Sequence, residues 1–396
     1  MTLSVADSLT RSRVPLAAPA GRPLTLYACG PTVYRYAHVG NLRTFLLADL
    51  VRRVLRARGV AVAAVQNVTD VGHLTDDTVD HAEDKMLVAA GLEGRSAAEI
   101  AAHYTAAFLA DAKRCNLVPF DAHPRASDHV DAMLELIARL VAAGHAYDTP
   151  DAVYFSVPTF PGYGRLSHNR LDALQPGAGE SSPHKRFHGD FALWRKAGPR
   201  RQVVWNSPWG RGFPGWHIEC SAMSLAYLGE HIDVHLGGVD LQFPHHEAEI
   251  AQSDAAVGHP VVTVWLHGEH LLADGRKMSK SAGNVVDLRS LDERGVDPLA
   301  FRLLCLQARY RTQVNFTWEA VGAAARALQR LRAHCAELDA AARDEDATGA
   351  VVEDRTAPIA ARFDATVDDD LDTPTALTLV HAVAGGDRDA GLPPAV

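Results

Sequence analysis

Two segments far apart in the chain carry residue types suited to binding phosphate groups. His38-Val39-Gly40-Asn41 lies between a predicted strand and a predicted helix, and a helix N-terminus offers unpaired N–H groups and a partial positive charge to an anion. Gly40 permits close approach, and His38 and Asn41 can donate hydrogen bonds. Lys277-Met278-Ser279-Lys280-Ser281 places two lysines where their charges can surround a polyphosphate. Each segment alone fits a polar helix cap or a solvated lysine loop.

A third set of residues has the chemistry of a metal site. His245 and Glu249 are four residues apart on a predicted helix and can share one face. Together with Cys29 and Cys220 they would supply two thiolates, an imidazole and a carboxylate, which all suit zinc. The spacing does not connect the two cysteines to this pair. From the residues alone, two buried cysteines and an unrelated helix-surface pair is the favoured interpretation.

The elements around these segments have an αβ rhythm. Residues 24–28 are predicted as a strand, 41–58 as a helix and 60–68 as a second strand, which makes a βαβ unit. Ligands of such units bind at the carboxyl ends of the strands. A helix is predicted from the capping box at Ser96 and Glu99, and another over 130–143. Residues 146–215 are β-rich with many Gly and Pro and indicate an insertion. Helices at 218–228 and 244–255 and strands at 232–236 and 261–266 follow.

The end of the chain is predicted to be helical. The clearest helix covers residues 318–343, and the polar, acidic stretch 340–354 is predicted as a linker. Five arginines on the late helical segment form either a local RNA-facing patch or a solvated helix face; these are Arg309, Arg311, Arg326, Arg330 and Arg332.

Composition narrows the class of protein. The chain has 396 residues, 47% hydrophobic and 22% charged, with a formal net charge of −9. These values fit a soluble globular protein of two or three domains and argue against coating of nucleic acid by net charge. Five widely spaced cysteines argue against a disulfide scaffold and favour a reducing, cytoplasmic location. Cys115, Cys305 and Cys335 are expected to be small buried residues. No apolar run is long enough to span a membrane.

Taken in order, the two phosphate-binding segments resemble the signatures of one enzyme class. His38 to Asn41 resembles the HIGH signature, and residues 277–281 are a complete KMSKS signature, so the chain resembles class I aminoacyl-tRNA synthetases. Within that class it is similar to the cysteinyl-tRNA synthetase family from about residue 5 to about residue 384. The segments that carry the resemblance are residues 29–34, 67–70, 190–194, 214–223, 237–241 and 243–253.

The resemblance implies a Rossmann-type parallel-sheet catalytic domain with an inserted connective domain, followed by an incomplete helical bundle. The implied units are 1–115 and 213–290 for the two catalytic halves, 116–212 for the insertion, 291–345 for a helical stem-contact region, and 346–396 for the start of the bundle and a tail. Residues 368–377 resemble the beginning of the family's bundle, and the rest of it and the anticodon-reading domain are not matched. A C-terminally shortened chain is therefore expected.

The resemblance also implies site residues and reactants. One zinc ion per chain would be held by Cys29, Cys220, His245 and Glu249, and cysteine would be bound by Cys29, Thr69, Trp216 and His245. The implied ATP-binding residues are His38, Gly40, Asn41, Gly237, Asp240, Lys277 and Lys280, of which His38, Asn41, Lys277 and Lys280 form the catalytic set. Magnesium would accompany ATP, the acceptor would be tRNA(Cys), and a monomer is expected rather than an oligomer. Arg35 departs from the family, which commonly has an acidic or amide residue there.

Three alternatives stay open. A mycothiol-pathway cysteine ligase passes activated cysteine to a small amine and lacks an anticodon domain, but residues 31–34 and 249–253 resemble the tRNA enzyme more closely. The expected shortening favours a noncatalytic cysteine or nucleotide sensor, whereas the intact metal, His38 and lysine motifs oppose it. A pantetheine-type nucleotidyltransferase is disfavoured by the predicted zinc ligands.

Overall fold

Four parallel strands form the central sheet of this computed structural model, which describes residues 2–71, 85–170, 182–198, 201, 203–278, 283–348 and 357–385. The strands are β3 (Leu24–Ala28), β4 (Val62–Gln66), β9 (Ile232–Gly238) and β10 (Val262–Gly268), in the order β10-β9-β3-β4. All three pairings are parallel. The strand order reverses between β3 and β9, and the crevice at their carboxyl ends is where open α/β sheets bind ligands.

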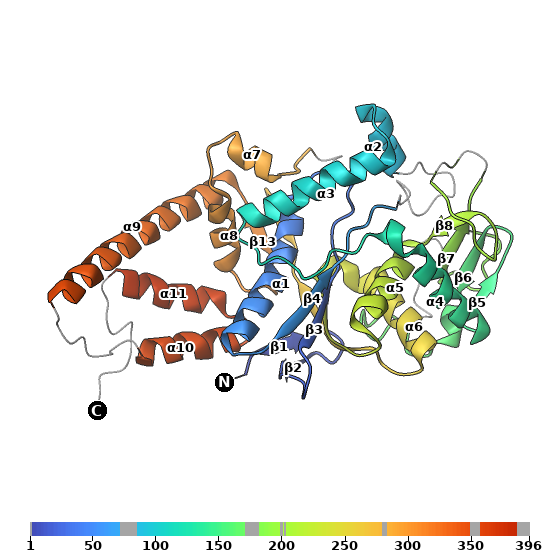
Figure 1. Cartoon of the computed structure of the whole chain (residues 1–396), viewed down its shortest axis with the longest axis horizontal. Helices are drawn as coiled ribbons and strands as arrows, with labels where there is room; N and C mark the ends of the chain where they lie inside the picture. The colour runs from blue at the N-terminus through green and yellow to red at the C-terminus, as the bar shows by residue number, and fades with distance from the viewer. Residues whose placement is uncertain are drawn as a thin grey trace.

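Helices cover both faces of this sheet, which confirms the predicted α/β class with a Rossmann-type arrangement (Figure 1). On one face α1 (Val39–Ala57) buries Leu47, Val51 and Leu55 against Leu26 of β3. On the other face α5 (Trp216–Leu228), α6 (Glu247–Val257) and α4 (Val130–Ala142) pack around Tyr27 of the same strand. Successive residues of β3 therefore point into two different cores, as expected for a strand buried on both faces.

Two further helices stand beside the carboxyl edge of the sheet. They are α2 (Lys85–Glu93) and α3 (Ala97–Arg114). Met86 of α2 and Ile100 of α3 lie in one apolar cluster with Val33 and Val68. The capping box predicted at Ser96 and Glu99 is confirmed at the start of α3.

The β-rich segment forms a separate antiparallel sheet with the strand order β5-β6-β7-β8. Its strands are β5 (Ala146–Asp148), β6 (Ala152–Phe155), β7 (Phe191–Lys196) and β8 (Gly212–Pro214). In Figure 1 this sheet lies at the end of the molecule opposite α9, α10 and α11. The division of the chain into five units, with its boundaries, stays a prediction.

A small three-stranded sheet leads into the lysine segment. Strand β11 (Leu271–Ala273) pairs with β12 (Arg276–Lys277) antiparallel and with β13 (Val314–Phe316) parallel. The helices after it are α7 (Leu288–Asp292), α8 (Pro298–Leu306), α9 (Trp318–Thr348), α10 (Ala357–Asp368) and α11 (Thr373–Ala384). At the start of the chain, β1 (Ser4–Asp7) and β2 (Ser12–Pro15) form a hairpin that meets residue Asp369 beside α10.

Several sequence predictions need correction. Pro244 does not open a regular helix: it lies in an irregular turn, Gln242–His246, in which Phe243 is extended, and α6 begins at Glu247. Residues 340–348 continue α9 rather than forming a linker, because Ala, Glu and Arg are good helix formers. Cys115 and Cys305 are buried as predicted, but Cys335 is exposed on the part of α9 that extends past the core. No helix among the described residues has the length and apolarity needed to cross a bilayer.

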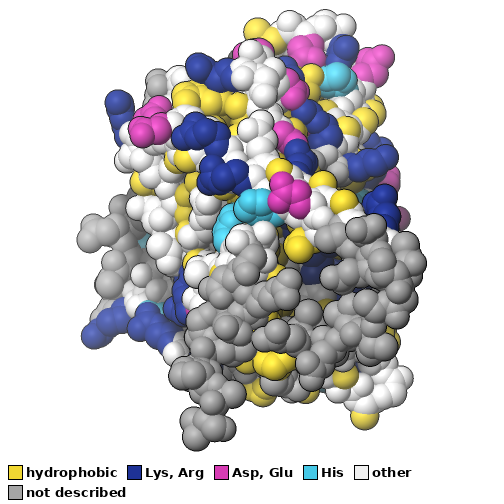
Figure 2. Space-filling view, turned by 90° about the vertical axis from the view of Figure 1, so that its left-hand side faces the viewer, with side chains coloured by type: hydrophobic (Ala, Val, Ile, Leu, Met, Phe, Trp, Pro, Cys, Tyr) yellow, Lys and Arg dark blue, Asp and Glu magenta, His cyan; other side chains and the backbone are white. Residues whose placement is uncertain are grey.

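The five arginines divide between ion pairs and the exposed surface of α9, and their role as an RNA-facing patch stays a prediction. Arg309 and Arg311 make ion pairs with Asp372 and Asp370 next to the C-terminal helices, so they hold the chain together. Arg332 pairs with Asp297. Arg326 and Arg330 are exposed on α9. On the described part of the face at this end of the molecule, Lys and Arg side chains are interspersed with Asp and Glu (Figure 2), which fits a solvated surface.

Candidate active site

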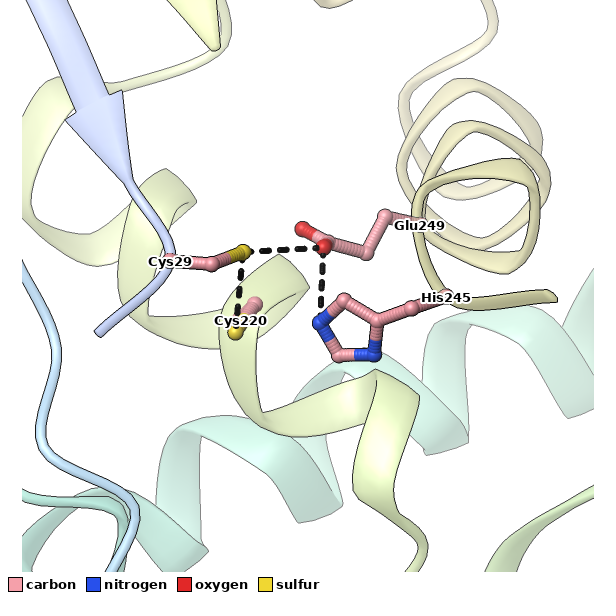
Figure 3. Close-up of side chains that lie close together, drawn as sticks. All are labelled: Cys29, Cys220, His245 and Glu249. Carbon is pink, nitrogen blue, oxygen red and sulfur yellow. Dashed lines mark hydrogen bonds and ion pairs between the residues drawn. The ribbon is translucent and has the colours of Figure 1, made fainter. Parts of the chain in front are cut away.

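Cys29, Cys220, His245 and Glu249 meet at the carboxyl edge of the central sheet (Figure 3). Cys29 directly follows β3, Cys220 lies on α5, and His245 and Glu249 flank the start of α6. Cys29 Sγ is 3.9 Å from Cys220 Sγ and 3.7 Å from Glu249 Oε1, and His245 Nε2 is 3.0 Å from Glu249 Oε1. All four side chains are buried. The fold therefore joins two cysteines that the sequence spacing did not connect.

The donor set fits a zinc ion. Ligand atoms at the corners of a tetrahedron around zinc are separated by about 3.3–3.8 Å, close to the distances between these atoms. Burial raises the pKa of Cys29 and of Glu249 well above their usual ranges, whereas the hydrogen bond from Cys29 lowers the pKa of Cys220 to about 7. The ionised forms of a buried carboxyl group and two buried thiols are unfavourable this close together unless a cation neutralises their charge.

A second combination of donors shares Cys29 and Glu249. His246 Nε2 lies 3.2 Å and His235 Nε2 3.5 Å from Cys29 Sγ, and both rings are buried. His246 Nδ1 is 2.7 Å from His267 Nε2. His235, His246 and His267 were not predicted as site residues, although the adjacent His245-His246 pair offered a signal. Burial lowers the pKa of His235, His246 and His267, so these rings are neutral.

The residues predicted to bind cysteine surround the same point. The Trp216 ring centroid is 4.4 Å from that of His245. The buried Thr69 donates a hydrogen bond to Glu219 Oε2 at 3.3 Å and accepts one from Asn67 Nδ2 at 3.1 Å. Glu219 and Asn67 were not predicted as site residues, although both lie in segments that carry the family resemblance and Glu219 precedes a proposed metal ligand.

His38 is the N-cap of α1. Its Nδ1 accepts a hydrogen bond from the Asn41 backbone N–H at 3.2 Å, and Asn41 Oδ1 accepts from the His38 backbone N–H at 3.2 Å. Because Nδ1 is the acceptor, a neutral ring carries its proton on Nε2 and can donate it outward. Burial and the positive charge of Arg35 lower the pKa of His38 to about 4. The Arg35 charge thus helps keep His38 neutral.

The lysine segment comes close to this helix terminus. A Cβ atom at Gly40 would lie 2.9 Å from Met278 Cε and 2.9 Å from His38 Nδ1, so a side chain at residue 40 would require one of them to shift. Lys277 is exposed at the end of β12, and Lys280 lies outside the described residues. Gly237 and Gly238 end β9, and Asp240 follows on an exposed turn (Val239–Leu241). A Cβ at Gly238 would lie 2.4 Å from Asp240 Oδ1. Of the predicted ATP-binding positions other than the lysines, Gly40 and Asn41 lie in the first turn of α1, which His38 caps, and Gly237 and Asp240 lie at and after the end of β9.

Comparison with known proteins decides the family. A family model described as "tRNA synthetases class I (C) catalytic domain" matches residues 17–326. The chain is 45% identical over 399 residues to Cysteine--tRNA ligase 1 of Burkholderia lata, covering all of this chain and 81% of that protein. It is 43% identical to Cysteine--tRNA ligase of Thermus thermophilus, covering 96% of this chain and 79% of that protein. The chain belongs to the cysteine–tRNA ligase family.

Solved structures agree on the fold of this cysteine–tRNA ligase family member. Methionyl-tRNA synthetase of Mycobacterium tuberculosis, in complex with methionyl-adenylate, superposes with a TM-score of 0.68 at 17% identity, covering 92% of this chain and 82% of that one. At that identity the likeness shows the class I fold. The assignment to the cysteine–tRNA ligase family rests on the sequence comparisons and not on this structural likeness.

Proposed function

We propose that this chain activates cysteine with ATP to form cysteinyl-adenylate and transfers the cysteinyl group to tRNA(Cys). One observation carries the proposal: a buried cluster of two thiols, an imidazole and a carboxylate lies at the β3–β9 crevice, where the fold also brings the capped N-terminus of α1. The family relatives support tRNA over a small amine as the acceptor, because they are named as tRNA ligases over almost the whole of this chain.

Cys29, Cys220, His245 and Glu249 would hold one zinc ion. Bound there, zinc would supply a soft Lewis acid that prefers a thiolate to an alcohol oxygen. This matters because an apolar pocket separates side chains of nearly equal size by only about 1–3 kcal/mol. Trp216 beside His245, and Thr69 held by Asn67 and Glu219, would enclose the small side chain of the substrate.

The chemistry itself needs no nucleophile from the protein. The cysteine carboxylate forms a bond to the α-phosphorus of ATP, and the bond to the pyrophosphate oxygen breaks. The terminal ribose hydroxyl of the tRNA then attacks the carbonyl carbon, and AMP leaves. The protein positions these groups and stabilises negative charge on the phosphate oxygens. Magnesium would accompany ATP as its phosphate-bound cation.

His38 and Asn41, at the start of α1, would contact the phosphate groups of ATP. The neutral His38 ring keeps Nδ1 occupied by the Asn41 N–H, so its Nε2–H is the group available to a phosphate oxygen. Lys277 and Lys280 would neutralise the departing pyrophosphate, and Asp240, exposed beyond β9, would accept from the ribose hydroxyls. Gly237 and Gly40 would leave room for the nucleotide.

Two assays test the proposal. The first measures amino-acid-dependent exchange of labelled pyrophosphate into ATP. This exchange should occur with cysteine and should be at least about a hundredfold slower with serine. Labelled cysteine should then pass to tRNA(Cys) and not to an amino-sugar acceptor. Absence of exchange in zinc-containing protein would favour a noncatalytic sensor, and transfer to the sugar alone would favour the small-amine ligase. A sedimentation measurement in the same buffer checks the expected monomer.

A further inference from the structure

Arg43, on the second turn of α1, is a buried arginine that has no role in the proposed reaction as described above. Within the described part of the chain, its side chain donates to four backbone carbonyls and to no side chain. Nη1 lies 2.9 Å from the Glu269 oxygen and 2.7 Å from the His270 oxygen. Nη2 lies 3.4 Å from the Arg309 oxygen and also contacts the Thr312 oxygen. The residue is 6% exposed.

The four carbonyls belong to two segments that feed the same small sheet. Glu269 and His270 immediately precede β11, and residues 309–312 precede β13, its parallel neighbour. These segments are also bonded to each other, by Glu269 N to the Tyr310 oxygen at 2.8 Å and by Val314 N to the His270 oxygen at 3.2 Å. The planar guanidinium presents its N–H groups as a fork that can reach both segments at once, whereas a lysine ammonium donates from one point.

This sheet carries Lys277. Strand β12 pairs with β11 and ends at Lys277, next to Met278 over Gly40. On the far side of the lysine segment the chain returns to α1, where Val39 N donates to the Val286 oxygen at 2.9 Å and His38 pairs with Asp287. The chain before the lysine segment is thus bonded to α1 through Arg43. The chain after it is bonded to α1 through residues 38 and 39.

We infer that Arg43 is a positioning residue for phosphate chemistry: by clamping the starts of β11 and β13 to α1, it fixes the distance between Lys277 and the helix terminus at His38. This rests on the proposed function. Burial lowers the pKa of the Arg43 guanidinium, and the nearby Glu269 carboxylate offsets only part of that penalty. A contact that served only to pack the helix on the strands would therefore be better made by an apolar residue.

Arg52 offers a matched control on the same helix. It is also buried, and its guanidinium also donates to backbone carbonyls, those of Val118 at 2.9 Å and of Pro119. Those carbonyls lie in the segment after α3, which is not part of the small sheet. Replacing Arg52 removes hydrogen bonds of the same kind from the same helix and leaves the contacts of β11 and β13 with α1 in place.

The test compares Arg43→Lys and Arg43→Gln with Arg52→Lys and Arg52→Gln in the full, zinc-containing chain. For the Arg43 variants, kcat of cysteine-dependent exchange per folded molecule should fall at least about tenfold, with the zinc content and the KM for cysteine unchanged. Arg43→Lys should retain more activity than Arg43→Gln. Hydrogen exchange should accelerate at the amides of residues 269–277 and 314–316. The Arg52 variants should keep kcat within about twofold, whatever they lose in thermal stability.

Two results would overturn the inference. One is an Arg43→Lys variant with unchanged kcat, or with a loss equal to that of Arg52→Lys. The other is failure of both Arg43 variants to fold while both Arg52 variants do, which would make Arg43 a folding residue. If the unaltered chain shows no exchange, the proposed function fails instead, and the hydrogen-exchange comparison still reports whether Arg43 holds the small sheet.

Discussion

At the scale of single residues, the candidate site depends on groups whose charge states are set by burial. The Cys29 thiol and the Glu249 carboxyl have raised pKa values, and His38 has a lowered one. The first two are the groups that a bound cation would deprotonate. The third stays neutral at physiological pH, so its Nε2–H can meet a phosphate as a hydrogen-bond donor.

Removing one of the four donors should release the metal. Cys220→Ser replaces a thiolate with a poor zinc ligand, and we expect at least a tenfold weaker hold on zinc. Zinc content after dialysis against a mild chelator measures this. Cys115→Ser is the matched control, since Cys115 is equally buried but remote from the cluster. Equal zinc retention in the two variants would contradict the assignment of Cys220 as a ligand.

His38 should make stability depend on pH. Its folded pKa of about 4 is below its unfolded value of 6.5, so the unfolded chain binds more protons between these values and stability falls as the pH drops from 6.5 towards 4. His38→Asn keeps a good N-cap without a titrating ring. Between pH 7 and pH 5 the unaltered chain should therefore lose about 2 kcal/mol more unfolding free energy than the variant.

Urea denaturation at both pH values measures the difference, and because the other buried histidines are present in both proteins, their contribution cancels. An identical loss in the two proteins would show that His38 is not a neutral, buried cap.

At the scale of elements, the loop after β3 is shaped by one close approach. A Cβ at Gly30 would lie 1.7 Å from the Asn67 backbone oxygen, and the Gly30 N–H donates to Asn67 Oδ1 at 2.8 Å. Gly30→Ala must therefore shift the backbone at Gly30 or at Asn67, and we expect the adjacent Cys29 to move with it. We expect zinc affinity to fall although all four ligands remain, and stability to fall by about 1–3 kcal/mol.

Gly322→Ala is the control for that substitution. Gly322 lies inside α9 with only the end of Arg326 near its Cβ position, at 3.7 Å. Alanine there should be neutral or stabilise the helix by up to about 1 kcal/mol. Zinc affinity and melting temperature, measured on both variants, separate the steric effect from a general effect of alanine. Unchanged zinc affinity in Gly30→Ala would mean that the loop can shift without moving Cys29.

Element types were predictable from periodicity, and their ends were predictable where a local rule applied. The strand at 24–28 has the predicted bounds. Helix α1 starts two residues before the predicted Asn41, because the His38–Asn41 cap encloses Val39 and Gly40, which look like loop residues in the sequence. The metal cluster was not predictable from spacing, since Cys29 and Cys220 are brought together by a parallel sheet; only the family resemblance connected them. Arg43 had no sequence signal, because its partners are backbone carbonyls.

At the scale of the whole molecule, Asp370 joins three distant parts of the chain. Its side chain is 1% exposed and accepts hydrogen bonds from the Ala6 N–H at 2.9 Å, from the Tyr310 hydroxyl at 2.5 Å and from Arg311 Nε at 2.8 Å. The N-terminal hairpin, the segment before β13 and the α10–α11 pair thus converge on one carboxylate. Its neighbour Asp369 is 60% exposed and pairs with the half-exposed Arg13.

Asp370→Asn should therefore destabilise the chain much more than Asp369→Asn. The amide places a donor against the Arg311 guanidinium and leaves that cation without its buried partner, at a cost of about 2–3 kcal/mol. The exposed pair at Asp369 contributes about 0.5 kcal/mol or less. Melting temperature compares the two variants, and high salt should not reverse their order, since the Asp370 carboxylate is buried although Arg311 is half-exposed. Equal melting temperatures would show that the C-terminal helices are held by their apolar contacts, such as Leu371 in the core beside α1, and not by this carboxylate.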